Sequence, residues 1–437
     1  MEPEPERASK SVTLAGLVYL VQRNANFRRL WLAQIVSELG DWFYTLAIYT
    51  LLLQLTGRAS SVGLALVLQV LPQTLIGPTA GVVNDRVKRK RVMITADLVR
   101  MVIVLAMLLV RTRSTVWLVY PLLLLETIMA AFFEPARSSV IPNITAREDV
   151  LLANTLSSTT WSLNLTIGAT VGGLVGALLG RDAVFLLNAL SFLGSALLIG
   201  RMRFSEPHAE TGKPFRLREL VDFSPILEGV RYVRAQRELL GTIFAKAGLL
   251  VIGPGWVLFT VMGQRVFALH WHGLDPQRAA MLGMSLLLGG RGLGAFVGPL
   301  VTAPWAGNRE NRLRLGIFAG FLFSCAGYTL FGAAPSLWVA CLCLAIAHFG
   351  GSTIWVFSTT LLQLHTDDRF RGRVFATELG LCMFTIAAGA FVAGLLVDRG
   401  FNPRVVASSA GLLMLIPAAA WGWKMRAPIP KELSAEA

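Results

Sequence analysis

Long apolar runs recur along this chain at intervals of about 36 residues, separated by short polar stretches. A membrane-crossing helix needs about 20 mostly apolar residues, and twelve runs of this kind can be marked in the sequence. Each run predicts one transmembrane helix. The expected spans are 30–55, 60–83, 92–110, 115–135, 151–179, 183–200, 239–269, 277–301, 315–332, 337–364, 374–397 and 405–423.

The composition agrees with this pattern. Of the 437 residues, 54% are hydrophobic and only 15% are charged, whereas soluble domains carry about 25% charged residues. A large soluble enzyme is therefore excluded, and so is a disordered chain, which would have far less apolar material. The first apolar run is too long for a signal peptide, so the first helix is expected to stay in the mature protein.

The cysteines and the acidic residues suggest no metal site. All four cysteines lie within apolar spans, without His neighbours or the spacing of metal ligands. They are interpreted as packing residues. They are Cys325, Cys341, Cys343 and Cys382.

Lys and Arg residues fall unequally on the two sides of these spans. With the N-terminus placed in the cytoplasm, 29 of the 40 cations lie on the cytoplasmic side, eight on the other side and three within helices. This is the positive-inside distribution of a multi-span protein. It predicts an even number of helices with both termini cytoplasmic, and it explains the net charge of +14 as orientation rather than nucleic-acid binding.

The longest connection divides the chain into two sets of six helices. The expected organisation is a cytoplasmic tail (1–29), a first bundle (30–200), a cytoplasmic linker (201–238), a second bundle (239–424) and a cytoplasmic tail (425–437). Residues 217–233 have near-helical apolar spacing, which favours an amphipathic helix on the inner membrane surface or a short soluble linker helix.

The two halves are weakly similar at a shift of about 220 residues. Segments 139–149 and 360–370, for example, are both polar inner loops that enter a helix. A parallel repeat of six helices predicts two bundles with a cavity between them and transport by alternating access.

Between the second and third spans stands Gly81-Val-Val-Asn-Asp85-Arg86-Val-Lys-Arg89-Lys-Arg91. This segment resembles the loop signature of the major facilitator superfamily, and the resemblance extends over essentially the whole chain. Segments 32–41, 132–137, 147–154 and 185–192 further resemble the bacterial branch that contains enterobactin exporters and macrolide efflux proteins.

The resemblance implies a cytoplasmic gating contact made by this loop. Asp85 would contact the start of the eleventh helix, where the helix dipole stabilises an anion by about 0.3 to 1 kcal/mol, and Arg86 and Arg89 would pair with nearby acids. Gly81 belongs to the same signature. The corresponding segment of the second half has Thr302 in place of the Asp, so only one such contact is expected.

Ionisable side chains at membrane depth are costly and are therefore functional candidates. The resemblance implies that the first, fourth, seventh and tenth helices line the cavity. Candidates for a proton-coupling or substrate site are Glu38, Asp41, Glu126, Asn164, Lys246 and Arg291. Asp97 and Arg100, three positions apart, are expected to form a structural charge pair.

The same carboxylates have an alternative interpretation as buried structural pairs, for example Asp41 or Glu126 with Arg291. A carboxylate that is partly removed from water binds a proton more readily, which a proton-coupling site requires. Both interpretations remain open at the level of sequence.

The fifth span is unusually polar and contains Asn164. Some of its polar side chains are expected to face a wet cavity or the opposite bundle. Its end resembles the antiporter signature of helix five, which implies that Gly168, Gly172 and Gly173 allow close contact between bundles. The family's Pro is Ala169 here, and the helix-four Arg of proton-linked drug exporters is absent.

The leading hypothesis is a secondary transporter that exports an amphiphilic small molecule of the drug or siderophore type by proton antiport. Lysophospholipid or lipid transport is the nearest alternative, and metal-ion export is less favoured than either. A membrane enzyme or scaffold is least favoured, since no catalytic motif is present. No cofactor is expected beyond the proton gradient. The resemblance implies a monomer in the bacterial inner membrane, with the lipid bilayer and a small-molecule substrate as partners.

Single Cys substitutions at Asp41, Glu126 and Arg291 test alternating access. In a background without the four native cysteines, membrane-impermeant thiol reagents should reach these positions from either side, depending on the conformation. Labelling that no change of side alters would argue against the mechanism.

Overall fold

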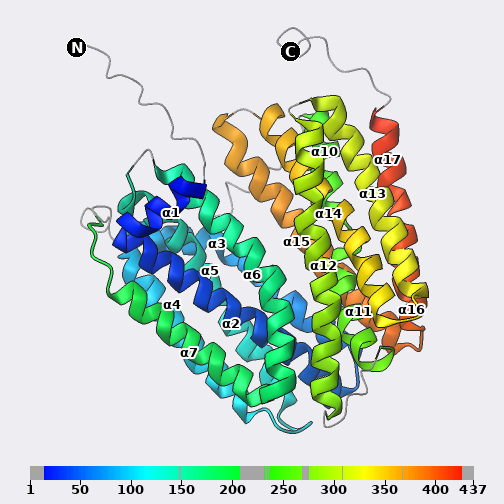
Figure 1. Cartoon of the computed structure of the whole chain (residues 1–437), viewed down its shortest axis with the longest axis horizontal. Helices are drawn as coiled ribbons and strands as arrows, with labels where there is room; N and C mark the ends of the chain where they lie inside the picture. The colour runs from blue at the N-terminus through cyan, green and yellow to red at the C-terminus, as the bar shows by residue number, and fades with distance from the viewer. Residues whose placement is uncertain are drawn as a thin grey trace. The chain divides into compact units, whose positions relative to one another are not determined.

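The computed structural model describes residues 14–146, 149–206, 231, 234, 236–267, 275–307, 309–366 and 368–425. Within these residues all regular secondary structure is helical (Figure 1). The predicted amphipathic linker helix at 217–233 falls almost entirely outside the described residues.

The described residues of the first half of the chain form seven α-helices. A short α1 precedes the first predicted span, and the six helices that follow cover the six predicted spans. Helix α4 continues into a 3₁₀ turn (Met107–Leu109), and another (Val116–Leu118) leads into α5. The helices are α1 (Leu14–Arg23), α2 (Ala25–Thr56), α3 (Ala59–Arg86), α4 (Arg89–Ala106), α5 (Val119–Ile144), α6 (Val150–Leu179) and α7 (Arg181–Gly200).

The helices of the second half also follow the predicted spans, but two spans are broken. They are α10 (Arg237–Ala247), α11 (Ile252–Arg265), α12 (Pro276–Ala306), α13 (Glu310–Ala333), α14 (Leu337–His365), α15 (Asp368–Asp398), α16 (Pro403–Leu413) and α17 (Leu415–Met425). The seventh span is divided into α10 and α11, and the twelfth into α16 and α17. Prolines explain both breaks, because Pro254 and Pro417 have no N–H to donate to the carbonyl four residues earlier.

Ten segments among the described residues are long and apolar enough to cross a membrane. Helices α2 and α6 are not among these ten. Charged residues such as Asp41 lower the hydropathy of α2, and the apolar stretch described in α6 is limited to Thr170–Leu179. The chain is thus a multi-span helical protein, while the count of twelve crossings and the side of the termini remain predictions.

The chain forms two compact units. The first comprises 1–48 and 72–222, and the second comprises 49–71 and 223–437. The division near residue 222 lies within the predicted linker, but segment 49–71, which the sequence assigns to the first bundle, groups with the second unit. Helix α2 therefore contributes residues to both units.

Packing and hydrogen bonds explain why segment 49–71 belongs to the second unit. A Cβ added at Gly63 would lie 2.8 Å from the carbonyl oxygen of Ala390 in α15. The Asp398 carboxylate accepts hydrogen bonds from the backbone N–H groups of Ala59 (2.6 Å) and Ser60. These bonds stabilise the N-terminus of α3, where four N–H groups lack helical partners. Arg265 donates to the carbonyl of Gly57 at 2.7 Å.

Within the first unit, α4 packs along α7 and α5 (Figure 1). An apolar core lies near the N-terminal ends of α2 and α4, where Leu20 of α1 packs with Phe27, Met93 and Phe133. In the second unit, α14 packs against both α12 and α13.

A row of glycines spaced four residues apart allows α12 to approach α14 closely. An added Cβ would lie 2.9 Å from the Cα of Cys341 at Gly290, and 2.6 Å from the carbonyl oxygen of Phe349 at Gly298. Between them, Gly294 lies directly against the backbone of Ala345. The helix backbones themselves are in contact here, so the row tolerates no side chain without a shift of one helix.

We predict that Gly294→Ala destabilises the protein by about 1–3 kcal/mol, the usual cost of overpacking a close-packed interior. The matched control is Gly77→Ala in α3, where an added Cβ meets nothing within 4 Å. Thermal unfolding in detergent, followed by intrinsic fluorescence, should show a lower midpoint for Gly294→Ala alone. Equal midpoints would show that the close approach of α12 and α14 is not required.

Candidate functional site

The first unit buries a charged cluster around Arg100 of α4. One guanidinium nitrogen of Arg100 donates to Asp97 Oδ1 at 2.5 Å, and Ser195 of α7 donates to Asp97 Oδ2 at 2.6 Å. The guanidinium also lies over the rings of Phe133 and Phe192, with its Cζ 4.7 and 4.3 Å from their centroids. The pair predicted to be structural is thus formed, and Ser195 and two aromatic rings hold it in place.

Asp41 of α2 contacts the same guanidinium more loosely. Its Oδ2 lies 3.7 Å from Arg100 Nη1, and its side chain is 36% exposed, whereas that of Asp97 is 0% exposed. Among the described residues, Asp41 Oδ1 has no hydrogen-bond partner. Asp41 is therefore held more loosely by Arg100 than Asp97 is.

Glu126 of α5 is the third acid of the cluster. It is 8% exposed and lies close enough to Asp41 and Arg100 to interact with both electrostatically. No hydrogen bond or ion pair holds its carboxylate within the part of the chain that the structure describes. Three carboxylates, those of Asp41, Asp97 and Glu126, thus share one guanidinium. If all three were ionised, the cluster would carry excess negative charge, which is costly in a medium of low dielectric constant.

Tyr44 is a member of this cluster that the sequence reasoning missed. It is 1% exposed, and its hydroxyl, which lies near Glu126 and Asp41, has no hydrogen-bond partner among the described residues. The sequence feature that could have identified Tyr44 is its position three residues after Asp41, which places both side chains on one face of α2.

Glu38 belongs to a separate polar network that joins α2 to α6. Its carboxylate accepts hydrogen bonds from Gln34 Nε2 and Asn164 Nδ2, both at 2.8 Å. Trp31 Nε1 donates to Thr160 Oγ1 at 2.8 Å one turn further along. The polar residues of α6 are thus partly used to satisfy polar side chains of α2.

The glycines of the fifth predicted span, which is α6, also face α2 within the first unit. An added Cβ would lie 3.0 Å from Trp42 Cβ at Gly168 and 2.6 Å from Phe43 Cδ1 at Gly172. Gly173 is buried. Their predicted role in contact between bundles remains a prediction.

The predicted gating loop is described only in part. The side chain of Asp85 and the environment of Gly81 lie outside what the structure describes. Arg89 donates to the carbonyl of Ser139 at 2.9 Å, so it ties the loop to the end of α5. Arg86 ends α3, and its predicted pairing remains a prediction.

In the second unit, Lys246 of α10 forms an ion pair with Glu378 of α15. The Nζ–Oε1 distance is 2.9 Å, and the two side chains are 5% and 1% exposed. Lys246 Nζ also donates to Thr359 Oγ1 at 2.9 Å and lies 4.6 Å from the ring centroid of Trp355. Glu378 is not among the predicted site residues, since spacing along the chain does not reveal a partner on another helix.

Arg291 of α12 differs from the other intramembrane cations. Its guanidinium Cζ lies 4.9 Å from the ring centroid of Trp256, and it interacts electrostatically with Tyr328 and His348. These two residues are hydrogen bonded to each other, with the Tyr328 hydroxyl 3.1 Å from His348 Nε2. No acid among the described residues forms an ion pair with Arg291.

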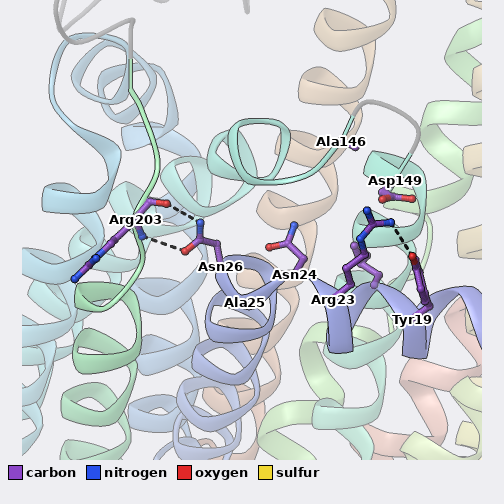
Figure 2. A pocket seen from close by; sticks show the side chains of 9 residues that line it. Tyr19, Arg23, Asn24, Ala25, Asn26, Ala146, Asp149 and Arg203 are labelled. Atoms are coloured by element: carbon purple, nitrogen blue, oxygen red, sulfur yellow. Dashed lines mark hydrogen bonds between the residues drawn. The ribbon is translucent and has the colours of Figure 1, made fainter.

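A cavity of about 420 Å³ lies at the junction of α1 and α2, away from the charged cluster. Figure 2 shows Arg23 donating to the Tyr19 hydroxyl and Asn26 exchanging hydrogen bonds with the backbone of Arg203. The sequence did not point to this cavity. It is lined by Tyr19, Leu20, Arg23, Asn24, Ala25, Asn26, Ala146, Asp149 and Arg203.

The sequence and the fold both match known transporters. The sequence is 24% identical to macrolide efflux protein A of Streptococcus pyogenes over 85% of this chain and 89% of that protein. It is 23% identical to the putative bacilysin exporter BacE of Bacillus amyloliquefaciens over 90% of this chain and 94% of that protein. The crystal structure of the nucleoside transporter NupG superposes with a TM-score of 0.68 over 92% of this chain and 100% of that one, at 12% identity, which shows the fold alone.

The match to a family of transporters extends over nearly the whole chain. Residues 19–436 match the family described as transmembrane secretion effectors. Together with the multi-span helical fold, this match shows a transporter rather than an enzyme: the chain belongs to the transmembrane secretion effector family of the major facilitator superfamily.

Proposed function

We propose that this protein is a proton-coupled exporter of amphiphilic small molecules that works by alternating access in the bacterial inner membrane. Two of its relatives are named for export of a macrolide and of bacilysin, which supports efflux of small organic molecules. The excess of cations in the expected cytoplasmic segments supports an orientation with both termini inside.

The observation that carries the proton coupling is the cluster of three carboxylates around Arg100. Asp97 is held by the shortest bond to the guanidinium and by Ser195, so it neutralises Arg100 in a fixed way. Asp41 and Glu126 are then left without a full counter-charge. A proton on either one removes the excess negative charge from a buried environment, and release of that proton restores it.

Asp41 is the better of the two proton carriers. Its side chain is more exposed than that of Glu126, and its carboxylate is held only by a 3.7 Å contact, so protonation breaks no short bond. It also lies on α2, the helix that continues to Tyr49 and the segment packed with the second unit. A change of charge at Asp41 can therefore influence the position of a helix that belongs to both units.

The remaining polar groups are assigned to substrate binding or to structure. Glu38 with Asn164 in the first unit, and separately Arg291 in the second, offer polar side chains at membrane depth and are proposed to bind substrate groups. Lys246 is paired with Glu378 in a buried contact, and we assign this pair a structural role.

We predict that Asp41→Asn abolishes the response of transport to a pH gradient. In proteoliposomes, a gradient of one pH unit corresponds to about 1.4 kcal/mol per proton and raises accumulation by up to about tenfold if one proton exchanges for one substrate. Accumulation of erythromycin or ethidium should show this increase for the wild type and not for Asp41→Asn. The variant should still exchange substrate across the membrane when no gradient is imposed. Glu126→Gln should weaken the response.

The control for this experiment is Asp182→Asn, which removes an exposed carboxylate paired with Arg111 at 2.6 Å and should leave the response intact. A wild type that ignores the gradient would refute proton antiport. A full response in Asp41→Asn would remove Asp41 from the coupling mechanism.

We predict that the Lys246–Glu378 pair contributes stability and not coupling. Lys246→Met alone should destabilise the protein by about 3–5 kcal/mol, because it leaves a buried carboxylate unpaired. Lys246→Met combined with Glu378→Leu should recover most of the thermal stability and the gradient-driven transport. A stable double variant without transport would instead place this pair in the transport mechanism.

A further inference from the structure

The cations within the predicted spans differ in how their charge is balanced. Arg100 bonds to Asp97 at 2.5 Å, and Lys246 contacts Glu378 at 2.9 Å. Arg291 forms neither an ion pair nor a hydrogen bond with any described residue, although it lies in the middle of α12. An unpaired charge at membrane depth carries a large desolvation cost. Arg291 is therefore the cation of the second unit that most needs a counter-anion.

The neighbours of Arg291 place it inside the second unit. Its guanidinium lies over Trp256 of α11, which is 9% exposed, and it interacts electrostatically with the buried Tyr328 of α13 and His348 of α14. The guanidinium is therefore directed toward neighbouring helices of its own unit.

The contacts of Arg291 leave its hydrogen-bonding edge available. Its Cζ lies 4.9 Å from the centroid of the Trp256 ring, and no described residue accepts a hydrogen bond from its N–H groups. A guanidinium presents these donors in a planar fork that matches the two oxygens of a carboxylate.

The surroundings of this cation are aromatic. Phe259 stacks near Tyr328 with ring centroids 6.5 Å apart, and His348 lies against both rings. These three side chains are buried, and Trp256, which is 9% exposed, makes an edge contact with Tyr49 at 6.2 Å between ring centroids. A ligand that reaches Arg291 would therefore place an anionic group on the guanidinium next to an indole ring.

We propose that Arg291 and Trp256 form a subsite for the carboxylate of an amphiphilic organic anion. This inference rests on the proposed transport function and adds a ligand class to it: molecules with an apolar, preferably aromatic, body and one carboxylate. Arg291 supplies the charge-assisted hydrogen bonds, and Trp256 holds the guanidinium flat and contacts the apolar body of the ligand.

Binding of matched probes to the detergent-solubilised full-length protein tests the subsite without any gradient. The probes are naphthylacetate and its uncharged analogue naphthylacetamide, measured by equilibrium dialysis. The wild type should prefer the carboxylate, and Arg291→Gln should weaken carboxylate binding by about 10- to 100-fold, the usual contribution of a charge-assisted hydrogen-bonded pair. Binding of the amide should change little.

Three further variants separate recognition from folding. Arg291→Lys keeps the charge but not the fork and should show an intermediate loss. Trp256→Leu should weaken both probes. Arg312→Gln is the matched control, because Arg312 also lies over a tryptophan, 5.9 Å from the centroid of Trp305, but on α13 away from the aromatic cluster, and it should change neither affinity.

The outcomes distinguish this subsite from the proposed transport mechanism. The subsite would be overturned, even if gradient-driven export is found, by any of three results. These are equal binding of both probes by the wild type, no binding of naphthylacetate, or an equal loss of affinity for both probes in Arg291→Gln. Selective carboxylate binding that depends on Arg291, in a protein that ignores the pH gradient, would support the subsite and refute proton antiport.

Discussion

The cost of placing charge inside a lipid-embedded helical protein governs the arrangement of this molecule. Each ionised side chain at membrane depth needs a counter-charge, hydrogen bonds or contact with water, and most of those described have them. Arg100 is neutralised by Asp97 and enclosed by two phenylalanine rings, and Lys246 is neutralised by Glu378. These contacts join helices that are distant in sequence, because α4 is tied to α7 through Ser195 and α10 is tied to α15. The polar groups therefore help to specify which helices pack together within each unit.

The groups whose charge or hydrogen bonds are incompletely satisfied are the ones that suggest a function. Asp41 contacts Arg100 only at 3.7 Å and keeps one oxygen without a hydrogen-bond partner among the described residues. Arg291 has an aromatic ring beneath it but no acid beside it within the described chain. The first is suited to gaining and losing a proton, and the second to receiving an anion from a ligand. A transporter needs groups of this kind, because a charge that is permanently neutralised by the protein cannot respond to a substrate or to a proton gradient.

Much of this arrangement could be predicted from the sequence. The positions of the helices follow from apolar runs, since the period and length of a membrane helix are set by local geometry and bilayer thickness. Asp97 and Arg100 could be recognised as neighbours because they are three residues apart on one helix. In contrast, the partners of Lys246, Glu38 and Asp41 lie on other helices, and the number of residues that separates two helices does not determine which faces meet. The grouping of segment 49–71 with the second unit could not be read from the sequence for the same reason, because it depends on contacts with α11 and α15 such as that of Asp398 with the start of α3.

The sequence by itself determined that the protein is embedded in lipid, where its helices form and which few ionisable residues lie within them. These properties depend on composition and on local spacing, which chain order records directly. Only the tertiary structure decided which of those residues are neutralised and which are not. Asp97 and Asp41 are both aspartates at membrane depth, yet one is fully buried in a short ion pair and the other is partly exposed in a long one. Their difference arises from the packing of α2, α4 and α7 around a single guanidinium.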